Sequence, residues 1–124
     1  TRVSIEQLAS EANVSPLIIA KGTVNALINM CQLHGTGHGS LGSALIGIDC
    51  QAASGRVTIT NLTTSFGGFT TAGVKLAGSG PVVLINSEAD ATLPGVPWLV
   101  TMDPTKISSI QSNLPASVGA YYLG

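Results

Sequence analysis

The chain has 124 residues, enough for one domain with a modest core. Only 9% of these residues are charged, compared with about 25% in an average soluble domain, and no apolar run approaches the roughly 18 residues of a membrane helix. The five basic residues are spread along the sequence and the formal net charge is −1, so we expect no strong nucleic-acid partner. So little charge favours a protein that packs against its own copies or works outside the cell.

The first third of the chain, from Val3 to Cys31, shows helical periodicity. Its apolar residues recur at three- and four-residue steps: Ile5, Leu8, Ala9, Ala12, Leu17, Ala20, Val24, Leu27, Ile28 and Cys31. Pro16 interrupts the pattern, because proline removes a backbone donor and disfavours helix at the residue before it. Two interpretations stay open: one kinked helix, or a short helix followed by a second one that begins near Pro16.

The rest of the chain has the pattern of strands and turns. A glycine-rich connector at 33–43 leads to strand candidates at 44–48, 56–62, 69–77, 82–86 and 96–102, of which 56–62 alternates most cleanly. The turn at 78–81 predicts a hairpin between its two flanking strands, and a short helical turn is expected at 106–111. We find neither an internal repeat nor a domain linker.

These elements predict an α+β fold in a single domain that covers residues 1–124. Short turns favour antiparallel pairing, so one long amino-terminal helix is expected to pack across a small antiparallel sheet. Trp98, the only tryptophan, is expected to anchor the core.

Two cysteines, Cys31 and Cys50, are present. An even count in a chain rich in Thr, Ser and Gly favours an oxidising compartment and one disulfide between them. The alternative is a metal site, because Cys31, His34, His38 and Cys50 could supply four tetrahedral zinc ligands. Their spacing is not that of a standard zinc finger, so the disulfide is preferred.

No motif in the sequence predicts catalysis. The glycine-rich loop at 35–42 follows a helix and precedes a strand, the reverse of what a phosphate-binding loop needs. The motif around Ser40 lacks the first glycine of a nucleophile elbow. The carboxylates of Asp49, Glu88, Asp90 and Asp103 form no close pair on a strongly predicted element. We therefore expect no enzymatic activity and no cofactor.

Three stretches resemble one family. Residues 1–10 contain a basic residue, a Val-Ser pair, an acid and a Leu/Ala-rich run, in the order found just after the hydrophobic amino-terminal segment of bacterial type IV pilins. The strand that begins at Trp98 is similar to the last main strand of many pilins. Residues 113–117 resemble the Leu-Pro-Ala-Ser that often precedes their final cysteine.

This resemblance implies a structural subunit of an extracellular type IV pilus that supports adhesion, twitching motility or DNA uptake. Its partners would be copies of itself in a helical fibre and a host or abiotic surface. It would lie in the inner membrane before assembly, through an apolar segment that this chain lacks and that we expect to have been removed. Val118 stands where pilins carry their last cysteine, which would move the cross-link to Cys31 and Cys50.

A second hypothesis is a small secreted, disulfide-bonded binding or effector module. Its contact surface would be the loop at 35–42 or the irregular stretch at 103–124. It predicts that the chain is the complete mature protein, whereas the pilin hypothesis predicts a long apolar helix upstream of Thr1.

Overall fold

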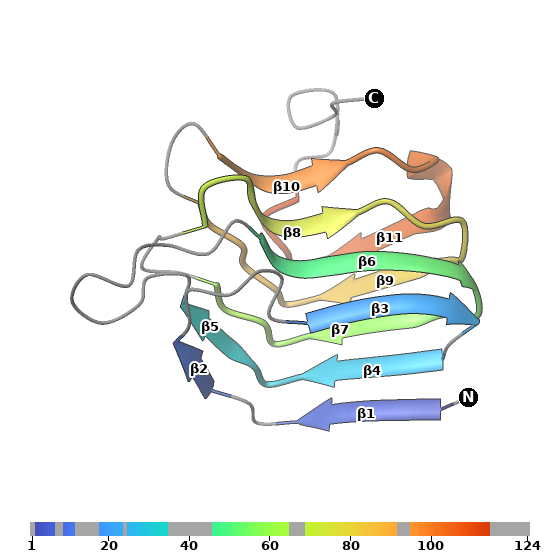
Figure 1. Cartoon of the computed structure of the whole chain (residues 1–124), viewed down its shortest axis with the longest axis horizontal. Coiled ribbons are helices and arrows are strands. Elements are labelled where there is room, and N and C mark those ends of the chain that lie inside the picture. Colours follow the sequence, from blue (N-terminus) through green and yellow to red (C-terminus); the bar gives the residue numbers. More distant parts are fainter. Residues whose placement is uncertain are drawn as a thin grey trace.

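A computed structural model describes residues 2–6, 9–11, 18–23, 25–34, 46–64, 69–91 and 95–114 of the chain. These residues form parallel strands and one 3-10 turn, η2, at Pro104–Lys106 (Figure 1). The strands are β1 (Arg2–Glu6), β2 (Ala9–Glu11), β3 (Ile18–Thr23), β4 (Asn25–Asn29), β5 (Gln32–His34), β6 (Ile46–Ser54), β7 (Val57–Thr60), β8 (Ala72–Leu76), β9 (Val82–Ile85), β10 (Val96–Val100) and β11 (Ile107–Ile110).

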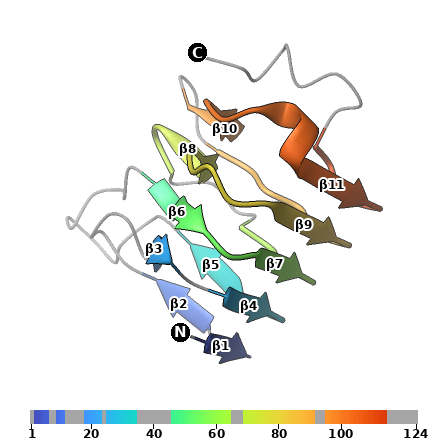
Figure 2. The ribbon, with the colours of Figure 1, turned by 90° about the vertical axis from the view of Figure 1, so that its right-hand side faces the viewer.

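The strands belong to three sheets that wind into a solenoid (Figure 2). One sheet has five strands in the order β1-β4-β7-β9-β11, and a second has four in the order β10-β8-β6-β3. A short third sheet pairs β2 with β5, and isolated bridges extend it through Thr63 to Glu88. Neighbouring strands within a sheet come from successive coils, so each coil packs mainly on the coils before and after it.

Two corners of each coil can be followed in the described residues. At the first corner, a strand of the four-stranded sheet leads into one of the five-stranded sheet, through segments such as Gly55–Arg56, 77–81 and 101–106. At the second corner, one residue with a left-handed backbone ends the strand of the five-stranded sheet. These residues are Met30, Asn61, Asn86 and Gln111, with φ between 48° and 54°.

The core consists of columns of apolar side chains that stack from coil to coil. In the five-stranded sheet, Ile28 pairs with Ile59, and Ile59 pairs with Leu84, and all three are buried. The opposite sheet contributes columns such as Cys50 with Leu76 and Val74 with Trp98. Because side chains alternate across a strand, every second residue faces this core and its neighbours face outward.

The long amino-terminal helix predicted from Val3 to Cys31 is wrong: the described residues of this stretch form β1, β2, β3 and β4. Ala26 and Ile28 face the core from β4, and the left-handed Met30 shifts the alternation so that Cys31 and Leu33 face it next. The core-facing residues on either side of Met30 are therefore three positions apart, which is also the spacing of a helix. Pro16, and with it the choice between kink and break, lies outside the described residues.

The antiparallel sheet and the predicted hairpin are also wrong. β8 and β9 belong to different sheets, and β9 pairs in parallel with β7 and β11. A repeat exists as well, because equivalent residues of the last three coils lie 25 residues apart, as Asn61 and Asn86 do. The helical turn expected at 106–111 is strand β11, preceded by η2.

Several strand positions are confirmed. β6, β7, β8, β9 and β10 each overlap a predicted strand, and Trp98 is fully buried in the core. No helix among the residues that the structure describes is long and apolar enough to cross a membrane.

Candidate binding groove on the five-stranded sheet

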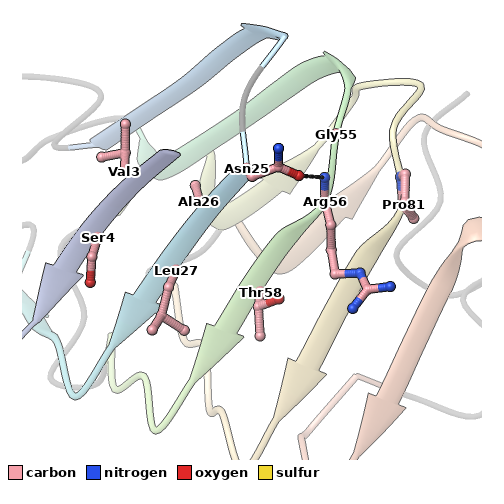
Figure 3. A pocket seen from close by; sticks show the side chains of 9 residues that line it. All are labelled: Val3, Ser4, Asn25, Ala26, Leu27, Gly55, Arg56, Thr58 and Pro81. Carbon is pink, nitrogen blue, oxygen red and sulfur yellow. Dashed lines mark hydrogen bonds between the residues drawn. The ribbon is translucent and has the colours of Figure 1, made fainter. Parts of the chain in front are cut away.

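A shallow groove of about 670 Å³ lies on the five-stranded sheet, near the first corner (Figure 3). A volume of this size is typical of ligand sites in proteins. The groove crosses the beginnings of β1, β4 and β7 and the turn before β9. Its lining residues are Val3, Ser4, Asn25, Ala26, Leu27, Gly55, Arg56, Thr58 and Pro81.

Three outward side chains from successive coils run across the groove. Ser4 pairs with Leu27, and Leu27 pairs with Thr58, so the three form one column. They point to the same side of the sheet, whereas Val3 and Ala26 point to the other side (Figure 3). Neighbouring strands are about 4.8 Å apart, so this column presents two hydroxyls and an aliphatic group at regular intervals along the solenoid.

Arg56 is held in place by its backbone. Its N–H donates to Oδ1 of Asn25 at 3.1 Å, and its carbonyl accepts from the N–H of Ala26 at 3.0 Å. Gly55 supplies the left-handed φ of 84° that the turn before Arg56 requires. A side chain at Gly80, one coil on, would collide with the Gly55 carbonyl, so the two turns stack closely.

The guanidinium of Arg56 extends to the same side of the sheet as Leu27 and Thr58 (Figure 3). Arg56 is exposed, and within the described part of the chain no hydrogen bond or ion pair is made by its guanidinium. A planar guanidinium binds carboxylate, sulfate or phosphate groups through two parallel hydrogen bonds. The groove therefore contains one anion-binding group that this part of the protein does not itself neutralise.

A second hollow of about 480 Å³ lies near the same corner, on the side of the four-stranded sheet. Gln51, Lys75, Ala77, Gly78 and Ser79 line it. Lys106 Nζ donates to the Ser79 carbonyl at 2.8 Å, and this bond ties the turn before β11 to the turn before β9. The corner between the two hollows thus carries Arg56 on one side and Lys75 on the other.

Asp103 lies at the first corner in the last described coil. Its Oδ1 accepts from the hydroxyl of Thr105 at 2.7 Å and from the backbone N–H of Thr105 at 3.0 Å. These two bonds, together with the charge of Lys106, lower the pKa of the Asp103 carboxyl below its usual 3.8. Asp103 therefore stays negative at neutral pH and partly offsets the charge of Lys106.

Asp49 is a buried carboxyl group on β6, with 8% of its surface exposed. Its Oδ2 accepts from Nε2 of Gln51 at 2.6 Å, and Oδ1 has no partner among the residues described. Lys75 is its neighbour in register on β8. No group of three or more His, Cys, Asp or Glu residues capable of holding a metal exists in the described ranges, so Asp49 is not part of such a centre.

The structure does not bring the predicted disulfide pair together. Cys31 and Cys50 are both buried, but no bond joins them and they lie apart. Cys31 follows the second corner, where its Sγ lies 3.5 Å from the Asn29 carbonyl, whereas Cys50 faces the core from β6.

The alternative metal site does not assemble in the part of the chain that can be tested. Since Cys31 and Cys50 lie apart, they cannot both bind one zinc ion with His34. His34 is the last residue of β5, and His38, the loop at 35–42 and Ser40 lie outside the described residues. Glu88 and Asp90 follow β9, whereas Asp103 belongs to the first corner.

The groove residues Asn25, Arg56 and Thr58 were not predicted from the sequence as site residues. The 25-residue spacing of the later coils could have revealed Arg56, because it places Arg56 and Lys106 at equivalent positions one residue before a strand.

Comparison with protein-family models, with curated proteins and with solved structures finds no match to this chain. The resemblance to type IV pilins therefore stays a prediction. The long helix on which its structural argument depended is absent from the described residues between 3 and 31.

Proposed function

We propose that this chain is a non-catalytic binding module whose groove holds an elongated polysaccharide. The observation that carries the proposal is the column Ser4, Leu27 and Thr58, which crosses the groove with one outward side chain per coil. A repetitive surface of this kind fits a ligand that is itself repetitive and extended.

The chemistry of the lining supports binding over catalysis. Hydroxyls, an amide and a guanidinium provide hydrogen bonds to sugar hydroxyls, while Leu27 and Pro81 supply apolar contact area. None of the nine lining residues is Asp, Glu, His, Cys or Lys. General acid-base catalysis depends on such groups, and the two hydroxyls of Ser4 and Thr58 have no base beside them in the lining to activate either one.

The test is an NMR titration of the ¹⁵N-labelled protein with oligosaccharides of dextran and of carboxymethyl-dextran. We expect at least one of the two to shift the amide signals of Ser4, Asn25, Leu27 and Thr58 while the signals of β8 and β10 stay in place. Absence of shifts with both probes, or shifts spread over the opposite sheet, would contradict the proposal.

A second candidate function is a fibre subunit that assembles through the ends of the solenoid, without the long helix expected from the sequence. Strands β1 and β11 are the two edges of the five-stranded sheet, and Val3 and Ile110 on these edges are 42% and 58% exposed. Pairing of β11 with β1 of a second copy would extend the solenoid and cover the edge that contains Val3. It would also place Lys106 and Arg2 in neighbouring coils of one column, and this repulsion makes the candidate weaker. Sedimentation velocity tests it, because end-to-end pairing predicts a mass that grows with concentration.

A further inference from the structure

The basic residues are scattered in the sequence but gather at one corner of the solenoid. Arg2 begins β1, Arg56 precedes β7, and Lys106 precedes β11. Lys21 and Lys75 lie within two residues of the ends of β3 and β8, at the same corner. All five basic residues of the chain therefore lie where the four-stranded sheet leads into the five-stranded one.

Most carboxyl groups lie elsewhere. Glu6 and Glu11 are the last residues of β1 and β2, and Glu88 and Asp90 follow the end of β9. Asp49 is buried on β6 at the level of Lys75 in register, and Asp103 belongs to the first corner. The basic residues are thus separated from most of the carboxyl groups, although the formal net charge of the chain is only −1.

Register places three of the basic residues in one column. Arg2 pairs with Asn25, and the pairs that follow put Arg56, Pro81 and Lys106 at the same position in the next three coils. A basic residue thus occurs at every second coil, about 10 Å apart along the solenoid at the usual strand spacing. We refer to Arg2, Asn25, Arg56, Pro81 and Lys106 as the corner column.

We propose that the groove binds an acidic polysaccharide, which lies along the solenoid axis with its anionic groups against Arg56 in the groove. Past Pro81 the polymer continues outside the groove to Lys106, whose Nζ also donates to the Ser79 carbonyl. This inference depends on the proposed function and specifies its ligand. The corner column runs beside the hydroxyl column of Ser4 and Thr58, so one chain laid across the coils meets charges on one side and hydroxyls on the other.

The lining argues against single-stranded nucleic acid as the occupant. Proteins that bind such strands stack the bases on aromatic side chains. None of the nine groove residues is aromatic, and Phe69 and Trp98 are fully buried. Sulfate or carboxylate groups on a sugar chain need only a cation such as Arg56 and the hydrogen-bonding groups that the groove provides.

The test compares three polymers of similar length by isothermal titration calorimetry: dextran sulfate, neutral dextran and an oligothymidylate. Dextran sulfate and dextran share one backbone, so their difference isolates the charge. We expect dextran sulfate to bind at least tenfold more tightly than dextran and more tightly than the oligothymidylate. Raising the salt from 50 to 200 mM should weaken its binding about fivefold to tenfold if two cations contact the polymer.

Variants locate the contact. Arg56→Gln and Lys106→Gln should each weaken dextran sulfate binding about fivefold to tenfold, and Arg56→Lys should recover part of the loss. Lys75→Gln is the matched control, because Lys75 belongs to the four-stranded sheet and not to the corner column, and it should change the affinity less than twofold. An unchanged thermal midpoint of Arg56→Gln shows that this variant is folded, since Arg56 is an exposed residue.

Three results would overturn the proposal. Equal binding of dextran and dextran sulfate at the groove removes the role of charge but leaves the proposed function standing. Equal losses from Lys75→Gln and Arg56→Gln mean that the polymer responds to overall charge without a defined column. Tighter binding of the oligothymidylate assigns the corner to nucleic acid.

Discussion

The side-chain amide of Asn86 donates a hydrogen bond of 2.9 Å to Oδ1 of Asn61, the equivalent residue one coil earlier. Both residues have left-handed backbones, with φ of 48° and 53°. Asn61 in turn donates to Oδ1 of Asn29 at 3.2 Å. This ladder of amides ties the second corners of three coils together, and asparagine is among the few residues that tolerate the backbone conformation there.

Replacing Asn86 should test the ladder. Asn86→Ala loses the amide bond and strains the left-handed backbone, so we expect it to lower the free energy of unfolding by about 1 to 3 kcal/mol. Asn86→Gly loses the same bond but relieves the backbone, and should cost about 1 kcal/mol less. Urea denaturation of the three proteins gives both differences. Equal stability of the two variants would show that the left-handed conformation is not strained.

Asn113 should be essential for the last described coil. Its Oδ1 accepts from the indole N–H of Trp98 at 2.7 Å and from the N–H of Ala89 at 3.0 Å, and its Nδ2 donates to the Ala89 carbonyl at 2.7 Å. Asn113→Ala leaves a buried indole donor without a partner, so we expect a loss of about 2 kcal/mol or more and a shift in tryptophan fluorescence. Asn25→Ala, whose bond is exposed, serves as control and should cost about 0.5 to 1 kcal/mol.

Both cysteines should react with a thiol reagent, because they form no disulfide with each other. Both are buried and no bond joins them, so an aromatic disulfide reagent should react slowly with the folded protein and with two thiols per chain in denaturant. Adding a reductant should leave the thermal midpoint unchanged. A midpoint that falls on reduction, with no reactive thiol before it, would restore the disulfide expected from the sequence.

The carboxyl of Asp103 should titrate at an unusually low pH. Because the hydrogen bonds from Thr105 lower its pKa in the folded state, they stabilise the folded protein above the unfolded pKa. This contribution is lost as the pH falls through the lower, folded-state pKa. Thr105→Val removes the hydroxyl donor and should return the pKa of Asp103 toward 3.8. An NMR titration of the Asp103 side chain measures both values, and the same pKa in both proteins would exclude the hydroxyl as the cause.

The sequence predicts the later strands well because each follows one clear alternation. In β7, Val57 and Ile59 face the core while Thr58 and Thr60 face outward, which is the pattern of a half-buried strand. The same rule fails in the first third, because the left-handed Met30 shifts the alternation by one residue between Ile28 and Cys31. No helical turn is needed to produce that spacing.

The parallel pairing was harder to predict because it depends on contacts between residues about 25 positions apart. Gly78 and Pro81 mark a turn correctly, but turn residues do not show whether the chain returns beside the same strand or passes to another sheet. The repeat is hard to recognise in the sequence because the coils share a geometry and not a residue type. The residues with the same left-handed backbone conformation are Met30, Asn61, Asn86 and Gln111.

The groove was hidden from the sequence for the same reason. Ser4, Leu27 and Thr58 share no motif, and only the winding of the coils places them side by side. Arg56 and Lys106 are 50 positions apart in the sequence, and only the register of β7, β9 and β11 places them in one column. Chemistry that depends on stacking between coils cannot be located before the coil period is known.

The groove and the corner column both depend on parallel, in-register stacking of β1, β4 and β7, and one NMR measurement tests this stacking directly. We predict extended backbone chemical shifts over residues 25–29, together with nuclear Overhauser contacts between the side chains of Leu27 and Thr58. Helical shifts over these residues, with contacts between positions three apart and none from Leu27 to Thr58, would contradict the solenoid, the corner column and the groove together.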